Sequence, residues 1–372
     1  MLNPADQKST AGADNFLRID GLTKRFQDVI AVDNVRIDVK RGEIFALLGS
    51  SGCGKSTLLR MLAGFETPSE GRILLDGTDI VGQPPHVRPI NMMFQSYALF
   101  PHLTVWDNIA FGLVRHKLPR DKIVERVEKM LALVQLTPYA KRKPHQLSGG
   151  QQQRVALVRS LALEPKLLLL DEPLGALDRK LREQTQLELH SIIKNVGVTC
   201  VMVTHDQEEA MTMADRIAIM SKGQMLQVGA PRDVYEAPSC RFVADFIGNV
   251  NLFDGVLAED APDHCVVETP DGRFYVGHGV TGVQGMALSV ALRPEKVQID
   301  TVAPEAGASN CLKATVQSRT YFGGSSVYHL VLNSGAKLKV SLLNTDRHGD
   351  LLPIGAVVYA RFSPDAIVVL TD

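Results

Sequence analysis

The chain contains the stretch Gly49-Ser50-Ser51-Gly52-Cys53-Gly54-Lys55-Ser56, which matches the pattern G-x-x-x-x-G-K-[ST] of a phosphate-binding loop. A short apolar run at residues 44–48 precedes it and is typical of a buried parallel strand. Apolar residues continue with helical character after it. Glycines let backbone N–H groups turn toward a phosphate, and a helix N-terminus adds positive partial charge. We therefore predict a strand, a phosphate loop and a helix, with ligand contacts from the consecutive residues Gly49, Ser50, Ser51, Gly52, Cys53, Gly54, Lys55, Ser56 and Thr57.

Two side chains of this loop have specific expected contacts with a nucleoside triphosphate. Lys55 is placed to reach the β- and γ-phosphates, and the Ser56 hydroxyl is placed to bind Mg²⁺. The strand, the helix, the lysine and the serine are all in place, so a glycine-rich turn without a ligand is disfavoured. The stretch indicates ATP and Mg²⁺ as cofactors.

A second motif is acidic. Four consecutive leucines at residues 167–170 are typical of a strand buried on both faces, and Asp171 and Glu172 follow them. The carboxyl ends of strands are where ligands bind in open α/β sheets. We expect Asp171 to hold Mg²⁺ directly or through water, and Glu172 to orient or deprotonate the attacking water. The alternative for Glu172 is a solvated surface acid.

Between these motifs lies the octet Leu147-Ser148-Gly149-Gly150-Gln151-Gln152-Gln153-Arg154. Ser148 and two glycines ahead of a helix that begins near Gln151 form a second anion-binding helix N-terminus. One chain cannot easily bring two such helix ends onto one γ-phosphate, whereas a head-to-tail pair of chains can. The octet therefore predicts a homodimer in which each chain completes the site of the other.

The order of the three motifs resembles one superfamily, the ATP-binding cassette (ABC) ATPases. The resemblance implies a P-loop NTPase cassette of α/β class, with a RecA-like core and a helical subdomain, whose activity is ATP hydrolysis. In that family the octet closes the ATP site of the second subunit, here through Ser148, Gly149, Gly150 and Gln151.

The resemblance also assigns roles to residues outside the motifs. Gln95 matches the Q-loop, which touches Mg²⁺ and senses the membrane partner, and His205 matches the switch histidine that contacts the γ-phosphate. Phe26 matches the aromatic residue that stacks on adenine, although mere packing is common for an aromatic near an N-terminal strand. Asp178 matches the D-loop along the dimer seam, or it caps the helix that follows; both readings are compatible. The family often has Ser where Gly175 stands, so no hydroxyl acts there.

Composition narrows the setting. The 372 residues suffice for two domains, and the net charge of −1 gives no electrostatic footprint for nucleic acid. Five scattered cysteines argue against a disulfide framework and for a reducing compartment. Residues 1–15 are polar and small, which predicts a disordered tail and no signal peptide. No apolar run approaches the roughly 18 residues of a membrane span, so in a transporter other chains would form the pore.

The texture of the sequence predicts two domains. Residues 16–249 alternate buried strands with helices, as in a doubly wound α/β domain, with a helical subdomain at about 96–155. Within Asp121–Leu136 the apolar side chains fall on one helical face, and in the family this insert docks the membrane subunits. Residues 250–372 alternate short apolar segments with turn signals, which predicts a small all-β barrel.

Two segments of this β domain, Leu292–Val297 and Tyr321–Tyr328, resemble the TOBE domain, an oligonucleotide-binding-like domain appended to one branch of ABC importers. Barrels that bind oligonucleotides use basic grooves with aromatic platforms, and basic residues are few here. The resemblance instead implies dimer contact and regulation, with no nucleic acid partner.

Within the branch, residues 92–102 and 321–328 look most like the ATP-binding subunits of putrescine/spermidine importers; relatives for ferric iron, sugars or sulfate share nearly the same layout. The resemblance implies a peripheral ATPase on the cytoplasmic face of the cell (inner) membrane, with two permease subunits and, indirectly, a solute-binding protein. ABC ATPases without a membrane partner usually carry two cassettes, long coiled coils or zinc sites, which this sequence lacks. A regulator switched by ATP stays open as a further reading and is compatible with transport.

Overall fold

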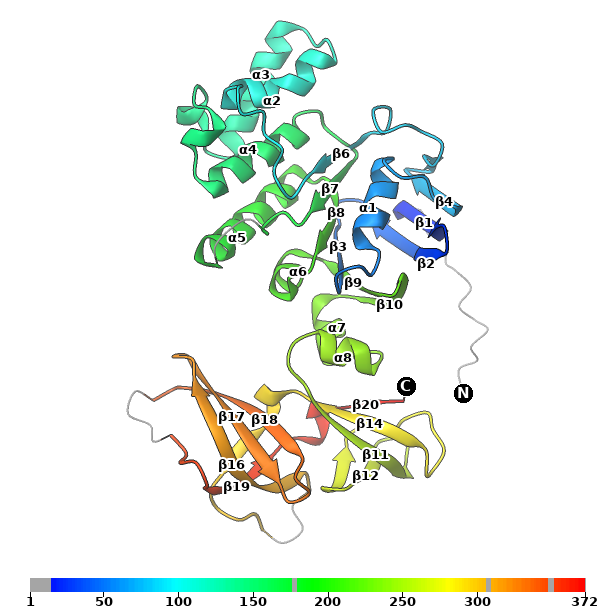
Figure 1. Ribbon diagram of the computed structural model, residues 1–372, viewed down its shortest axis with the longest axis vertical. Coiled ribbons are helices and arrows are strands. Elements are labelled where there is room, and N and C mark those ends of the chain that lie inside the picture. Colours follow the sequence, from blue (N-terminus) through cyan, green and yellow to red (C-terminus); the bar gives the residue numbers. More distant parts are fainter. Residues whose placement is uncertain (1–14, 176–178, 306–308, 347–350, 372) are drawn as a thin grey trace. The chain divides into compact units, whose positions relative to one another are not determined.

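A computed structural model describes residues 15–175, 179–305, 309–346 and 351–371. The chain forms two compact units, Met1–Pro231 and Arg232–Asp372 (Figure 1). The predicted tail, residues 1–15, lies outside the described residues except for Asn15, which begins the first strand. In the described part of the chain, no helix is both long enough and apolar enough to span a membrane.

The centre of the first unit is a six-stranded sheet in the order β10-β9-β3-β8-β7-β6. Its strands are β3 (Ile44–Gly49), β6 (Ile90–Met93), β7 (Leu167–Asp171), β8 (Thr199–Thr204), β9 (Arg216–Ser221) and β10 (Gln224–Gly229). All neighbours are parallel except β9 and β10. Every residue of β3 and β8 is buried, which explains their continuous apolar sequence. The carboxyl ends of β3, β6, β7 and β8 therefore meet at one edge.

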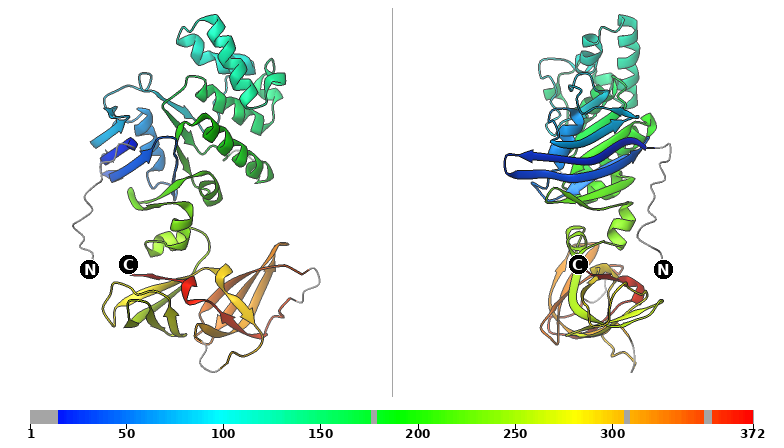
Figure 2. Two further views of the ribbon diagram at one scale, coloured as in Figure 1. Left: turned by 180° about the vertical axis from the view of Figure 1, so that it is seen from behind. Right: turned by 90° about the vertical axis from the view of Figure 1, so that its right-hand side faces the viewer.

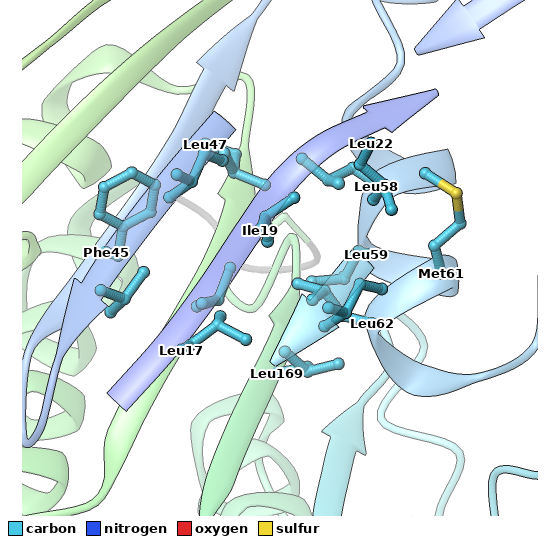
Figure 3. Packing of buried hydrophobic residues seen from close by; sticks show 14 of the residues in the cluster. Leu17, Ile19, Leu22, Phe45, Leu47, Leu58, Leu59, Met61, Leu62 and Leu169 are labelled. Carbon is cyan, nitrogen blue, oxygen red and sulfur yellow. The ribbon is translucent and has the colours of Figure 1, made fainter. Parts of the chain in front are cut away.

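A second, antiparallel sheet in the order β2-β1-β4-β5 covers helix α1. These elements are β1 (Asn15–Phe26), β2 (Val29–Lys40), α1 (Lys55–Ala63), β4 (Glu70–Leu75) and β5 (Thr78–Asp79), and Figure 2 shows the long β1–β2 pair. The core of the unit lies between the sheets. In Figure 3 side chains of α1 such as Leu58 and Leu62 pack with Leu17 and Leu22 of β1. This packing fixes the start of α1, and with it the end of the loop before it.

The remaining helices of the first unit are α2 (Val105–Arg115), α3 (Arg120–Leu133), α4 (Gly149–Leu161), α5 (Arg179–Val196) and α6 (Gln207–Met213), with 3-10 turns at Thr137–Tyr139 and Pro144–Gln146. The segment predicted as helical, about 96–155, holds α2, α3 and the start of α4. The expected apolar face is present on α3, because Val127, Met130 and Leu131 are buried. The helix ends before Leu136, since Gln135 takes a left-handed φ of 57°.

The second unit begins with two short helices, α7 (Pro231–Glu236) and α8 (Arg241–Phe246), and continues as two five-stranded antiparallel sheets around one apolar core. The first sheet has the order β13-β12-β11-β14-β20 and consists of β11 (Asn251–Asp260), β12 (Cys265–Thr269), β13 (Gly272–Val276), β14 (Ala287–Leu292) and β20 (Ile367–Leu370). The second has the order β15-β19-β16-β17-β18 and consists of β15 (Gln298–Asp300), β16 (Cys311–Tyr321), β17 (Ser325–Leu332), β18 (Lys337–Leu343) and β19 (Val357–Arg361). The prediction of an all-β C-terminal domain is confirmed.

One buried cation connects the helices α7 and α8 to these sheets. The guanidinium of Arg293, a residue that is 5% exposed, donates hydrogen bonds to the carbonyl oxygens of Tyr235, Ala244 and Asn249. It also lies 4.2 Å from the centre of the Tyr235 ring. Because of these contacts the helices belong with the second unit, whereas the sequence places the domain boundary after them, at Asn249. That boundary stays a prediction.

Candidate active site

The site predicted from sequence is at the carboxyl edge of the central sheet. The phosphate loop follows β3, Gln95 lies two residues beyond the end of β6, Asp171 ends β7 with Glu172 next to it, and His205 follows β8. These strands are neighbours in the order β3-β8-β7-β6. The sheet therefore brings together side chains that are far apart in the sequence.

The backbone of the phosphate loop requires glycine at two positions. A Cβ atom at Gly49 would lie 2.2 Å from the carbonyl oxygen of Met220, and one at Gly54 would lie 2.2 Å from that of Ala31. Gly54 also has a φ of 107° and is the N-cap of α1, with no side chain bonded to the first turn. The N–H groups of that turn are therefore left for a ligand from outside the helix.

The Lys55 ammonium group lies inside the loop. Its Nζ donates to the carbonyl oxygens of Gly49 at 2.7 Å and Ser50 at 2.9 Å, and the residue is only 6% exposed. Cys53 is also buried, with its Sγ 3.7 Å from Lys55 Nζ. Ser56 is exposed on the first turn of α1. The loop thus has the donors and the bare backbone that fit a phosphate group.

The carboxylates of Asp171 and Glu172 lie at the end of β7, at the same edge of the sheet as the phosphate loop. Burial raises the pKa of Asp171, the neighbouring Glu172 raises it further, and Arg60 lowers it. Hard cations such as Mg²⁺ use oxygen ligands and usually take one or two from protein carboxylates, the rest from phosphates and water. Within the described residues no cluster of three or more His, Cys, Asp or Glu could hold a metal ion. The Asp171 carboxylate and the Ser56 hydroxyl are donors that suit Mg²⁺ bound together with a phosphate ligand.

Glu172 is held by two other predicted site residues. Its Oε2 accepts a hydrogen bond of 2.8 Å from Nε2 of Gln95, and its Oε1 lies 3.0 Å from Nδ1 of His205. The Glu172 backbone has a left-handed φ of 45°, a conformation that costs on the order of 1–3 kcal/mol for a non-glycine residue and is common at active sites. Its N–H donates to the carbonyl oxygen of Val203 on β8. Gly175 lies nearby, and a Cβ there would be 3.5 Å from Gln95 Nε2.

The octet forms the start of α4. Ser148 is the N-cap, and its Oγ accepts from the N–H of Gln151 while Gln151 Oε1 accepts from the N–H of Ser148. This capping box begins the helix at Gly149, two residues before the expected start near Gln151. Among the described residues, no hydrogen bond joins residues 148–151 to the loop at 49–57 of the same chain.

The remaining predicted residues have different outcomes. Phe26 ends β1, is 42% exposed and has Lys24 Nζ 4.6 Å from its ring centre, so its predicted stacking on adenine stays a prediction. Asp178 lies outside the described residues. Gly149 and Gly150 lie in the first turn of α4.

Sequence reasoning missed a buried acid behind His205. Glu209 on α6 is 3% exposed, and its carboxylate accepts a hydrogen bond from the Thr204 hydroxyl, which in turn accepts from the N–H of Asp206. Burial raises the pKa of Glu209 to about 7. Its position on the same buried face of α6 as Met213 is the signal that could have identified it.

Sequence reasoning also missed a clamp on the segment after Gln95. Tyr97 and Ala98 both have positive φ, and the Arg159 guanidinium of α4 donates to their carbonyl oxygens at 2.8 Å and 2.7 Å. Gln153, also on α4 and 1% exposed, donates to the carbonyl oxygen of Pro173 next to Glu172. The helix that begins with the octet is therefore bonded to both sides of the Gln95–Glu172 pair.

Models of two protein families match the chain: ABC transporter over residues 32–175 and TOBE domain over residues 290–370. The chain is 55% identical to the putrescine transport ATP-binding protein PotG of Escherichia coli (strain K12), over 96% of this chain and 95% of that protein. It is 47% identical to the spermidine/putrescine import ATP-binding protein PotA of Rubrobacter xylanophilus, over 96% and 94%.

Solved structures match the cassette. The chain is similar to cbiO1 from Clostridium perfringens, part of the ABC transporter complex cbiONQ, with a TM-score of 0.56, 33% identity, and coverage of 59% of this chain and 90% of that chain. It is also similar to a dimeric ATP-binding cassette in a post-hydrolysis state with ADP and Pi, with a TM-score of 0.51, 31% identity, and coverage of 58% and 99%.

The fold and the site thus define a nucleotide-binding P-loop NTPase of the cassette type. With relatives this similar over nearly the whole chain, the chain belongs to the family of ABC import ATP-binding proteins with a C-terminal TOBE domain. Its enzymatic activity is ATP hydrolysis coupled to transport.

Proposed function

We propose that this chain hydrolyses MgATP at a site shared by two copies of itself and thereby powers import of a polyamine such as putrescine. The proposal of ATP hydrolysis is supported by the hydrogen-bonded group of Gln95, Glu172 and His205. This group lies at the edge of the central sheet where the phosphate loop also lies. The polyamine assignment rests on the names of relatives that match over more than nine-tenths of this chain.

In the proposed mechanism the residues of the loop bind and Glu172 acts on water. The N–H groups of residues 49–57 and the Lys55 ammonium bind the phosphates, and Ser56, Asp171 and Gln95 would hold Mg²⁺. Bound Mg²⁺ supplies charge neutralisation at the phosphates. Glu172 accepts the proton of the attacking water. Its strained backbone and its bonds to Gln95 and His205 keep the carboxylate aimed at that edge.

The partner copy supplies the second half of the site. The N–H groups and the Ser148 hydroxyl at the start of α4 form an anion-binding helix end, which we assign, with Gly149, Gly150 and Gln151, to the γ-phosphate bound by the other chain. A solved relative of the cassette is a dimer. Phe26 stacks on the adenine, and Asp178 lies along the seam between the chains.

The membrane partners follow from the import function. We propose two permease subunits that receive the work of hydrolysis and a solute-binding protein that delivers the solute to them, with this chain peripheral on the cytoplasmic face. The polyamine contacts those partners and not this chain, so the test of the solute is made in cells.

Uptake measurements test the proposal. Cells that lack this chain should lose uptake of radiolabelled putrescine, and the wild-type chain should restore it while Glu172→Gln should not. Uptake of sulfate, ferric iron and sugars serves as the control. If the deletion leaves putrescine uptake intact and removes one of the control activities, the polyamine assignment is wrong. If Glu172→Gln restores uptake fully, the assignment of the base is wrong.

A further inference from the structure

A cleft of about 630 Å³ opens at the edge of the central sheet opposite the candidate active site. Its walls come from α3, from the segment before β7, from the end of α5 with the start of β8, from Phe16 of β1 and from Arg41, which directly follows β2. A strand rises about 3.3 Å per residue, so the length of β7 places the cleft on the order of 15 Å from Asp171. It is separate from the nucleotide site.

The floor of the cleft is apolar. Met130, Leu161 and Val198 line it and are themselves buried, and Val196, which is 44% exposed, also lines it. Phe16 lines it too, but the Arg41 guanidinium covers its ring at 4.2 Å from the ring centre. A volume of this size lies in the range of pockets that hold small organic ligands. The floor would remove the apolar body of such a ligand from water.

The rim of the cleft is basic. Arg41, Arg126, Lys129 and Lys166 line it, against the single acid Glu164. Arg41 and Lys166 both pair with one carboxylate just outside, that of Asp76, each at 2.6 Å. The cations are therefore in excess even when both carboxylates are counted.

The ion pair of Arg126 with Glu164 on the rim can be replaced by a pair with a ligand carboxylate. Arg126 pairs with Glu164, whose side chain is 66% exposed, and the bond from Arg126 with the nearby charge of Lys129 keeps the Glu164 pKa low. Lys129 adds a second positive charge near the Glu164 carboxylate. Exposed ion pairs contribute little to stability, so another carboxylate can replace Glu164 at Arg126 at small cost.

We propose that this cleft binds a small soluble amphipathic anion, a carboxylate on an aliphatic or aromatic body. The body lies on the floor of Met130, Leu161 and Val198, and the carboxylate bonds to Arg126 and Lys129 in place of Glu164. An ammonium ligand of the same shape binds more weakly, because it faces the excess of cations on the rim.

Decanoate and decylamine are matched probes, since they share a tail and differ in the sign of the head. In equilibrium dialysis with the full chain, radiolabelled decanoate should bind saturably with one site per chain, and saturating ATP should not displace it. Decylamine should bind at least tenfold more weakly. Lys129→Glu should weaken decanoate binding tenfold or more, whereas Lys122→Glu, on the same helix but outside the cleft, should leave it unchanged.

Val196→Trp provides a second variant, because it fills the cleft from an exposed position and should block decanoate without loss of fold by circular dichroism. The proposal is overturned by an absence of saturable binding, by displacement with ATP, or by equal affinity in folded Lys129→Glu protein. Recruitment of the chain to phosphatidylglycerol vesicles through Lys129, with no binding of free decanoate, would also overturn it, since the rim would then recognise a lipid surface.

Discussion

Gln95 and Glu172 are joined by a hydrogen bond of 2.8 Å from Nε2 to Oε2, although they follow separate strands, β6 and β7, and lie 77 residues apart. Because β6 and β7 are parallel neighbours, both side chains emerge at the same edge. His205 meets the other carboxylate oxygen at 3.0 Å. The carboxylate is thus oriented from two sides before any nucleotide arrives.

This relationship predicts a graded loss of activity. A hydrogen bond to a charged group is worth about 1.5–3 kcal/mol, so Gln95→Ala should lower kcat roughly 10- to 100-fold. Glu172→Gln should lower it more, by about 10²- to 10⁴-fold, since the base itself is lost. Steady-state ATPase assays measure both. Equal losses in the two variants would show that the proposed contact of Gln95 with Mg²⁺, and not its hydrogen bond to Glu172, dominates its role.

Lys55→Ala tests the phosphate loop. Loss of the ammonium charge at the phosphates should reduce hydrolysis by at least about 10²-fold. The side chain also satisfies two loop carbonyls, so a stability cost on the order of 1–3 kcal/mol is expected while the fold survives. Near-normal turnover in a folded Lys55→Ala protein would refute the assignment of the loop. Lys122→Ala, at an exposed position of α3, is a control for loss of a lysine.

Glu209 predicts a dependence of stability on pH. Burial raises its pKa in the folded chain from 4.5 to about 7, so the folded state holds a proton that the unfolded state has released between these values. The free energy of unfolding should therefore fall as pH rises from about 4.5 through about 7, by on the order of 3 kcal/mol. The charged and titratable groups facing Glu209 are Asp206, Arg182, His205 and Tyr97.

Glu209→Gln keeps the shape and the acceptor for Thr204 but does not titrate. Urea unfolding at pH 5 to 8 should show a flatter profile for this variant, with the largest gain over wild type at pH 8. Glu208→Gln, one position earlier and exposed, should keep the wild-type slope. If the free energy of unfolding depends on pH in the same way for Glu209→Gln and the wild type, Glu209 does not hold a proton in the folded state.

Sequence patterns can predict the part of the candidate site in which one motif specifies both the residue types and the backbone conformation. The phosphate loop needs glycine at Gly49 and Gly54 because neighbouring carbonyls leave no room for a Cβ, and that need is written in the motif. The left-handed φ of Glu172 and Tyr97 has no such signature, because other residues impose it. Arg159, which bonds to the Tyr97 carbonyl, reads as an ordinary helix residue in the sequence.

The domain boundary also depends on contacts that the sequence pattern does not show, and these contacts give a testable prediction. The change in sequence pattern places the boundary at Asn249, but hydrogen bonds from Arg293 connect α7 and α8 to the second unit. A fragment that starts at Arg232 should therefore be more stable to urea than one that starts at Val250, which leaves the buried guanidinium without acceptors. Arg293→Met, made in both fragments, should reduce the difference between their urea midpoints. Equal midpoints for the two fragments would place the boundary at Asn249.

The last prediction joins Glu172 to the partner copy. Glu172→Gln should bind MgATP without consuming it, so the nucleotide stays in place between Lys55 of one chain and Ser148 of the other. A ligand that binds only the closed pair shifts association by mass action, by about 2.7 kcal/mol per site at 100 times its Kd. Small-angle scattering should show a compact closed dimer with MgATP, and a monomer or an open dimer without it.

Adding Ser148→Arg should abolish that closure, because a bulky cation replaces the N-cap hydroxyl of α4. The double variant should still bind ATP, since the loop is intact, and it serves as the control. If MgATP leaves the shape and association of Glu172→Gln unchanged, the shared site is wrong. If the double variant closes as well, the dimer forms without Ser148 at the phosphate, and the octet has another role.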